Sequence, residues 1–188
     1  MGRRDYENEA ATAAVDGHLS EPVVRALIVG AAGSQEGTLG GALKSLFGRS
    51  RRKSGLRHQN ALVLTPSSIR VFTCTGGRAW PPEVDEEVGA WPVTDVKVSA
   101  EAAEKWAAFS ATESGSQTNR FYNIALTVPD AEEPVVVQVT RTDSARATIQ
   151  ALEDATGSKP SRITARRRKK QQREAAEHEE SARAEEAD

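Results

Sequence analysis

The sequence predicts a mainly β protein with additional helices (α+β): a curled antiparallel sheet of about seven short strands, closed by one C-terminal helix and preceded by short N-terminal helices. Two observations predict this class. Between residues 61 and 142, apolar and polar side chains alternate with a period of two, in short runs that turn residues separate. From residue 143 the apolar period becomes helical. No predicted strand is joined to the next by a helix, so the pattern excludes a βαβ series.

The bulk composition is that of a soluble chain whose core is built from Val, Ile, Leu and Ala. Of its 188 residues 28% are charged, 38% are hydrophobic and 5% are aromatic, and the net charge is -2. This charge gives no overall attraction to nucleic acid. Residues 23–32 form the longest apolar run, far below the roughly 20 residues of a membrane-spanning helix. The N-terminus has no apolar signal-peptide core, so we expect a cytoplasmic protein, either free or peripherally attached to a membrane.

The first 58 residues are predicted to precede the sheet. Residues 1–20 have few large apolar side chains and no periodicity, which predicts a disordered leader. Residues 21–58 are expected to form a Gly-rich helical segment that ends in a basic loop. Both a helix and a strand fit the short, Val-rich run at 23–31. A second short helix is expected at 39–47, where Gly48 would end it.

The strand series begins with a hairpin. ALVLT and IRVFTCT flank the short turn PSS, a spacing typical of two antiparallel strands. An acidic loop, PPEVDEEVG, is expected at residues 81–89. The remaining predicted strands are AWPVTDVKVSA, KWAAFSATE, NRFYNIALTVP and PVVVQVTRT.

The last predicted helix is DSARATIQALEDATG, with Thr142 or Asp143 as its N-cap and Gly157 at its end. Its apolar stripe consists of Ala145, Ile149 and Leu152. Residues 158–188 are basic first and acidic second, and no apolar stripe runs along them. We therefore expect a charged tail that is disordered or a solvated helix.

Three segments resemble the bacterial pleckstrin-homology-like (PH-like) domain family. ALVLTPSSIRVFTCTGG resembles its opening hairpin, WPVTDVKVSAE a later strand, and PVVVQVTRTDSARATIQALEDATG its last strand and closing helix. The similarity is greatest to actinobacterial proteins that carry a Gly-rich segment before such a domain. The resemblance implies a PH-like domain at residues 59–157, folded as a partly open barrel, with a non-catalytic role as an interaction module that binds a protein partner.

A basic cluster in the predicted loop is the main candidate binding site. Five cations lie within nine positions, and they could contact the phosphates of anionic lipid headgroups. A solvated connector explains the same residues without any ligand. The five candidate residues are Arg49, Arg51, Arg52, Lys53 and Arg57.

The glycine-rich segment 30–41 raises a third possibility, a nucleotide-binding enzyme. The dinucleotide motif GxGxxG is incomplete here, because position 32 is Ala32 rather than glycine. No Gly-Lys-Ser/Thr sequence follows Gly33, so the P-loop motif is also missing. We therefore expect no enzyme and no cofactor, and interpret the glycines as part of a connector.

The remaining reactive or aromatic residues have structural explanations. Cys74 lies in a strand-like run and is expected to be a buried small hydrophobe. The tryptophans are expected to pack in or beside the core. The three histidines lie far apart in the sequence, so no metal site is predicted. These residues are Trp80, Trp91, Trp106, His18, His58 and His178.

Overall fold

The computed structural model describes residues 3–31, 56, 59–75, 83–107, 117–129, 131–165, 167–169, 171–173 and 175. Its elements are α1 (Arg3–Asp16), β1 (Arg25–Ala31), β2 (Asn60–Leu64), β3 (Ser68–Cys74), β4 (Val84–Pro92), the 3-10 turn η1 (Val93–Asp95), β5 (Lys97–Ala107), β6 (Gln117–Thr127), β7 (Val135–Thr140) and α3 (Asp143–Ala155). This part of the chain is mainly β with helices, as the period change along the sequence predicts.

The seven strands form one antiparallel sheet in the order β4-β3-β2-β1-β7-β6-β5. Strand β1 is shared between the two halves, because Arg25 to Val29 pair with β2 while Gly30 and Ala31 pair with β7. The other neighbours follow one another in sequence. The sheet is therefore two meanders joined through β1.

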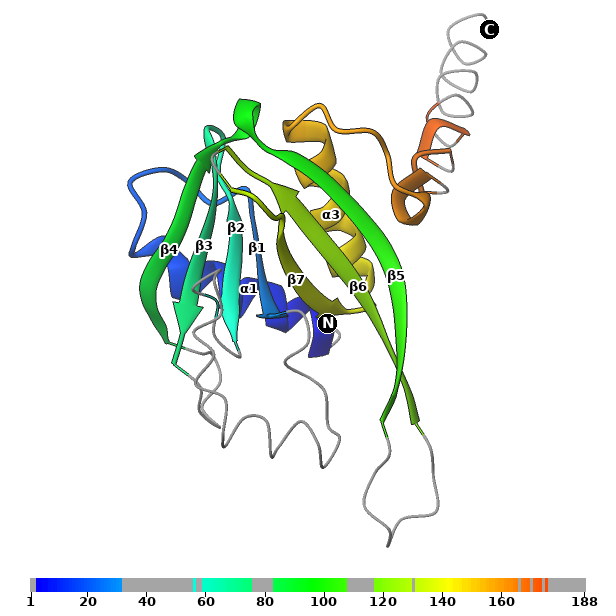
Figure 1. Ribbon diagram of the computed structural model, residues 1–188, viewed down its shortest axis with the longest axis horizontal. Helices are drawn as coiled ribbons and strands as arrows, with labels where there is room; N and C mark the ends of the chain where they lie inside the picture. Colours follow the sequence, from blue (N-terminus) through cyan, green and yellow to red (C-terminus); the bar gives the residue numbers. More distant parts are fainter. Residues whose placement is uncertain are drawn as a thin grey trace, which may run out of the picture.

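A short link brings the two outer strands together at one end. Only residues 93–96 separate the end of β4 from the start of β5, although these strands occupy opposite edges of the sheet. So short a link forces the two edges to converge where η1 lies, and Figure 1 shows them diverging below it. The sheet is curled and its two edges do not pair.

The main core fills the inside of this curl. Large side chains from the strands point inward, and the buried stripe of α3 packs against them. Leu152 and Ile149 of α3 are fully buried, which confirms the predicted apolar stripe. Fully burying such a side chain contributes about 1.5–3 kcal/mol. The central strand residues of this core are Leu27, Val29, Leu62, Leu64, Ile69, Val71, Ile124, Leu126 and Val137.

A second cluster lies on the outer face of β1, β2 and β3, beneath α1. Ala11 and Val15 are four residues apart, so they share one face of α1, and both are fully buried. They pack with Ala26, Ala61, Val63, Phe72 and Cys74. The prediction of a disordered leader at 1–20 is therefore wrong for residues 3–16. Its small apolar residues gave no strong period, yet they suffice for close packing against the sheet.

Two further expectations need correction. The run at 23–31, for which helix and strand both fitted, contains β1, so the sheet begins well before the expected domain start at residue 59. The expected helix at 39–47 lies outside the described residues. The acidic run placed in a loop at 81–89 includes most of β4. Its alternation is broken because bulges shift its pairing with β3, and three acidic residues in succession face water. Asp85, Glu86 and Glu87 are exposed.

Several local signals are confirmed. β2 and β3 form the expected hairpin, in which the Thr65 amide donates to the Ser68 carbonyl at 2.9 Å. The Thr142 hydroxyl caps α3 by accepting from the Ala145 amide at 3.0 Å. Gly157 follows the helix with a positive φ of 62°, the conformation that glycine adopts at least cost.

The packing of α1 against the sheet can be tested by introducing aspartate at two positions of that helix, one buried and one exposed. Val15→Asp places a charge against the outer apolar cluster and should lower the free energy of unfolding by roughly 2–4 kcal/mol. Ala13→Asp adds the same charge at an exposed position of the same helix and should change it by less than about 0.5 kcal/mol. Urea unfolding measures both, and equal effects would contradict the packing of α1.

Glu21 gives a pH-dependent prediction. The Ser67 hydroxyl donates to its carboxylate at 2.7 Å, and this bond lowers the pKa of Glu21 below its ordinary value of 4.5. The resulting stabilisation is present above pH 4.5 and is lost as pH falls through the lowered folded-state pKa. Ser67→Ala should raise the pKa of Glu21 toward 4.5, as carboxyl NMR titration would show. Ser99→Ala, at an exposed serine elsewhere, should leave it unchanged.

Candidate functional site

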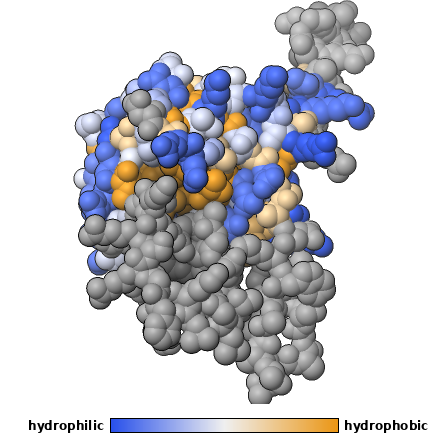
Figure 2. Space-filling view, viewed as in Figure 1, coloured by the Kyte–Doolittle hydropathy of each residue, from blue (hydrophilic) through white to orange (hydrophobic). Residues whose placement is uncertain are grey.

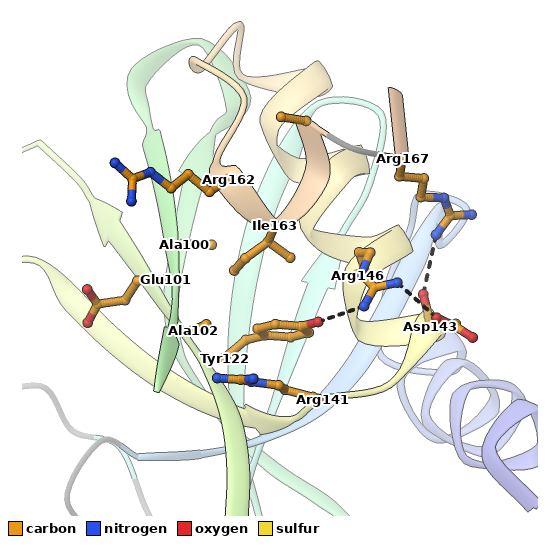
Figure 3. A pocket seen from close by; sticks show the side chains of 11 residues that line it. Ala100, Glu101, Ala102, Tyr122, Arg141, Asp143, Arg146, Arg162, Ile163 and Arg167 are labelled. Carbon is orange, nitrogen blue, oxygen red and sulfur yellow. Dashed lines mark hydrogen bonds and ion pairs between the residues drawn. The ribbon is translucent and has the colours of Figure 1, made fainter. Parts of the chain in front are cut away.

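A wide cleft of about 1340 Å³ opens beside the edge strand β5. One wall is the inner side of β5 and β6, and the opposite wall is the first turn of α3 together with the C-terminal segment, residues 161–165, 167 and 168 (Figure 3). Four arginines surround it. The lining residues are Ala100, Glu101, Ala102, Tyr122, Arg141, Asp143, Arg146, Arg162, Ile163, Ala165 and Arg167.

Tyr122 forms the floor of the cleft and is held by two arginines. The guanidinium carbon of Arg141 lies 5.6 Å from the centre of the Tyr122 ring. Arg141 is fixed by donating to the carbonyls of Phe121, at 3.0 Å, and Ala103, at 3.2 Å. Arg146 donates to the Tyr122 hydroxyl at 3.0 Å. The floor is therefore rigid, because the ring is buried and its polar end has a partner.

The C-terminal segment is held in place by a buried carboxylate. Glu153 of α3 is only 1% exposed. It accepts a hydrogen bond from the Ser161 amide at 3.0 Å and another from the Thr164 hydroxyl at 2.6 Å. Arg168 adds an ion pair at 3.1 Å. Every one of these donors belongs to the C-terminal segment, so Glu153 fixes the wall that carries Arg162 and Arg167.

Arg168 also reaches the exposed neighbour of Glu153. Its other guanidinium nitrogen lies 2.6 Å from the Asp154 carboxylate. Burial opposes the charged form of Arg168, but the hydrogen bonds and charges of Glu153 and Asp154 outweigh it and raise the pKa of Arg168. Arg168 therefore stays charged and pairs with two carboxylates of unequal burial.

The expectation of a disordered or solvated tail at 158–188 is consequently wrong for its first part. Thr164 is fully buried and Ile163 packs against the main core. The sequence did hold a signal for this docking. Glu153 lies four residues after Ile149, on the apolar stripe of α3, and a carboxylate at such a position requires donors from elsewhere in the chain.

The cleft has an excess of positive charge. Asp143 is the acidic group on the α3 side, and its carboxylate is largely exposed, 3.1 Å from Arg146. Glu101 points away from the cleft in Figure 3, and its carboxylate accepts from the Asn123 amide at 3.1 Å on the other face of the sheet. Arg162 is exposed and makes no hydrogen bond or ion pair with any described residue. The arrangement favours an anionic ligand.

The predicted basic cluster, Arg49, Arg51, Arg52, Lys53 and Arg57, lies outside the described residues. The β2–β3 hairpin turn is described, and its polar groups have internal partners. Ser67 binds Glu21, and Arg70 pairs with Glu87 at 2.9 Å. The hairpin therefore offers few free groups to a phosphate. Seen from the side shown in Figure 1, the described surface is hydrophobic across its middle and hydrophilic above and to the right (Figure 2).

The other singled-out residues have structural roles where the structure describes them. Cys74 is buried as predicted, and burial raises the pKa of its thiol. Trp91 packs against the main core and covers Gly89, where an added Cβ would overlap the indole ring. Trp80 and the side chain of Trp106 lie outside the described part, as do His58 and His178. His18 is exposed in the turn after α1.

Comparison with protein-family models, with curated proteins and with solved structures found no match for this chain. Among the described residues, no helix is long and apolar enough to cross a bilayer. The same residues contain no group of three or more His, Cys, Asp or Glu side chains arranged to hold a metal ion. The assignment of a function therefore starts from the cleft itself.

Docking of the C-terminal segment can be tested with two isosteric substitutions. Glu153→Gln removes the buried charge and replaces one acceptor by a donor, so it should lower the free energy of unfolding by about 1–3 kcal/mol. Asp154→Asn removes the half-exposed partner of the same arginine and should cost about 0–1 kcal/mol. Trypsin should cleave after the arginines and lysines of residues 162–170 faster in Glu153→Gln than in the unchanged chain, and no faster in Asp154→Asn. Equal cleavage in both variants would show that Glu153 does not hold the segment.

Proposed function

We propose that the protein is a non-catalytic interaction module of the PH-like type, working in the cytoplasm, and that it binds an extended segment of a partner protein at the edge of β5. The strand order and the closing helix α3 support the PH-like assignment, because a curled seven-stranded meander with a C-terminal helix is what the resemblance implies. The buried state of the single cysteine is compatible with a reducing compartment.

The observation that carries this proposal is the free edge of β5 along the cleft. The Val98 amide points away from β6 and donates to the Ser158 hydroxyl at 2.9 Å. Because backbone groups alternate along a strand, those of Ala100 and Ala102 point to the same side. No described residue pairs with these two at that side. An extended peptide can therefore add there as a further strand.

The cleft gives such a segment room for its side chains. Ala100 and Ala102 line it with methyl groups alone, so every second side chain of an added strand could point between β5 and the C-terminal segment. Backbone hydrogen bonds would provide affinity and the cleft would provide selectivity. Among the described residues that line the cleft there is no serine, threonine, cysteine or histidine that could act as a nucleophile or base.

The two alternatives receive less support. Binding of anionic lipid depends on residues 49–57, which lie outside the described residues apart from Leu56, and Arg70 of the β2–β3 hairpin is already paired. A dinucleotide-binding enzyme would need β1 as a parallel strand in a βαβ unit, whereas β1 is antiparallel to both of its neighbours.

Strand addition at β5 is tested by one substitution made on each edge of the sheet. Proline at position 102 removes the outward amide and blocks an added strand, but it spares the ladder to β6. Ala90→Pro is the matched control in the opposite edge strand, where Pro92 already occupies the equivalent outward position. Random nonapeptides displayed on phage should be enriched by the full chain and by Ala90→Pro, and not by Ala102→Pro.

Peptides that bind both proline variants equally would overturn strand addition at β5. Failure to enrich any peptide on the unchanged chain would overturn it as well. Circular dichroism of the two variants establishes that both remain folded, so loss of binding in Ala102→Pro reports on the edge of β5 and not on unfolding.

A further inference from the structure

The arginines define which segment the cleft accepts. Arg146 and Arg167 both contact Asp143 at the start of α3. Arg146 pairs with the Asp143 carboxylate at 3.1 Å, and Arg167 donates to the Asp143 carbonyl oxygen at 3.4 Å. Arg162 is exposed and stands on the same wall. In Figure 3 Arg162 extends over β5 near Ala100, Arg167 extends the opposite way toward Asp143, and Ile163 points into the cleft between them, toward Tyr122. A ligand that lies along β5 therefore meets the methyl groups of Ala100 and Ala102, with the guanidinium group of Arg162 above the strand and that of Arg146 deeper in the cleft.

We propose that the bound segment carries acidic side chains at alternate positions, which point into the cleft and pair with Arg162 and Arg146. This inference rests on the proposed strand addition at β5. An added strand lies about 4.8 Å beyond β5, and its inward side chains recur every second residue. Glutamate and aspartate at those positions would face these guanidinium groups, which match a carboxylate in charge and in hydrogen-bonding geometry.

The local charges favour carboxylates over apolar side chains at these positions. An apolar side chain would take water from several guanidinium groups and return no hydrogen bond, which is unfavourable. A carboxylate replaces that water with charged hydrogen bonds. The described apolar lining consists of Ile163 and three alanines, and the Tyr122 ring is already covered by Arg141, so the charged groups outweigh the apolar surface. The partner segment is therefore an acidic strand.

The phage-selected nonapeptides test this inference through their composition. We expect Asp and Glu to be enriched about threefold at positions spaced by two. Arg162→Gln should weaken binding of a selected synthetic peptide about threefold, and Arg146→Gln with Arg162→Gln about tenfold. The control Arg173→Gln removes an exposed charge outside the cleft and should have no effect. Arg146→Glu with Arg162→Glu should select peptides without acidic enrichment.

Peptides that depend on position 102 but show no acidic excess would overturn this inference and leave strand addition standing. If acidic peptides still bound Ala102→Pro, both strand addition and the alternate spacing of the acids would be wrong. The preference of the cleft for acidic ligands would then stand by itself. Selection is repeated on a full chain whose C-terminal acids are changed to Gln. If acidic peptides were enriched only on this variant, the acidic tail of the chain itself would be the occupant of the cleft in the unchanged protein, and the proposal of a partner segment would be wrong. The changed residues are Glu174, Glu177, Glu179, Glu180, Glu185, Glu186 and Asp188.

Discussion

The Glu153 carboxylate lies on the buried stripe of α3, where an ionised group is tolerated only if its oxygens are fully hydrogen-bonded. Its donors come from Ser161, Thr164 and Arg168, which follow the helix in sequence and fold back onto it. If the segment detached from α3, the buried Glu153 carboxylate would lose its hydrogen-bond donors. Since this segment contributes Arg162, Ile163 and Arg167 to the lining of the cleft, the shape of the candidate site depends on this carboxylate together with the packing of Ile163.

A second constraint comes from the four residues that link β4 to β5. They hold the edges of the sheet together at one end, while the right-handed twist of the strands separates the edges at the other. Ser158 satisfies the amide of Val98 near the closed end, so the edge becomes free only toward Ala100 and Ala102. The same link that allows the curl therefore leaves an unpaired edge beside the cleft, which is where we place the partner.

Much of the fold could be predicted because its signals are local. The β2–β3 hairpin and α3 follow from alternation, turn residues and caps. The errors arose where burial depends on distant partners. Residues 26–29 are apolar on both faces because α1 covers one side and the main core the other, so their pattern fits helix and strand equally. The acidic side of β4 faces water, and charge alone was mistaken for a loop.

The candidate site could not be predicted in the same way, because tertiary contacts assemble it from four separate segments. Arg141 and Arg146 follow β7, whereas Arg162 and Arg167 sit in a stretch whose charge suggested solvation. A net charge of -2 hides this concentration, since acids elsewhere balance it in the sum but not in the cleft. Arg141 and Arg146 lie at the margin of the apolar core, where two backbone carbonyls and the Tyr122 hydroxyl accept their hydrogen bonds. The core therefore stops at Tyr122, and the space beyond it stays open and polar, suited to an anion.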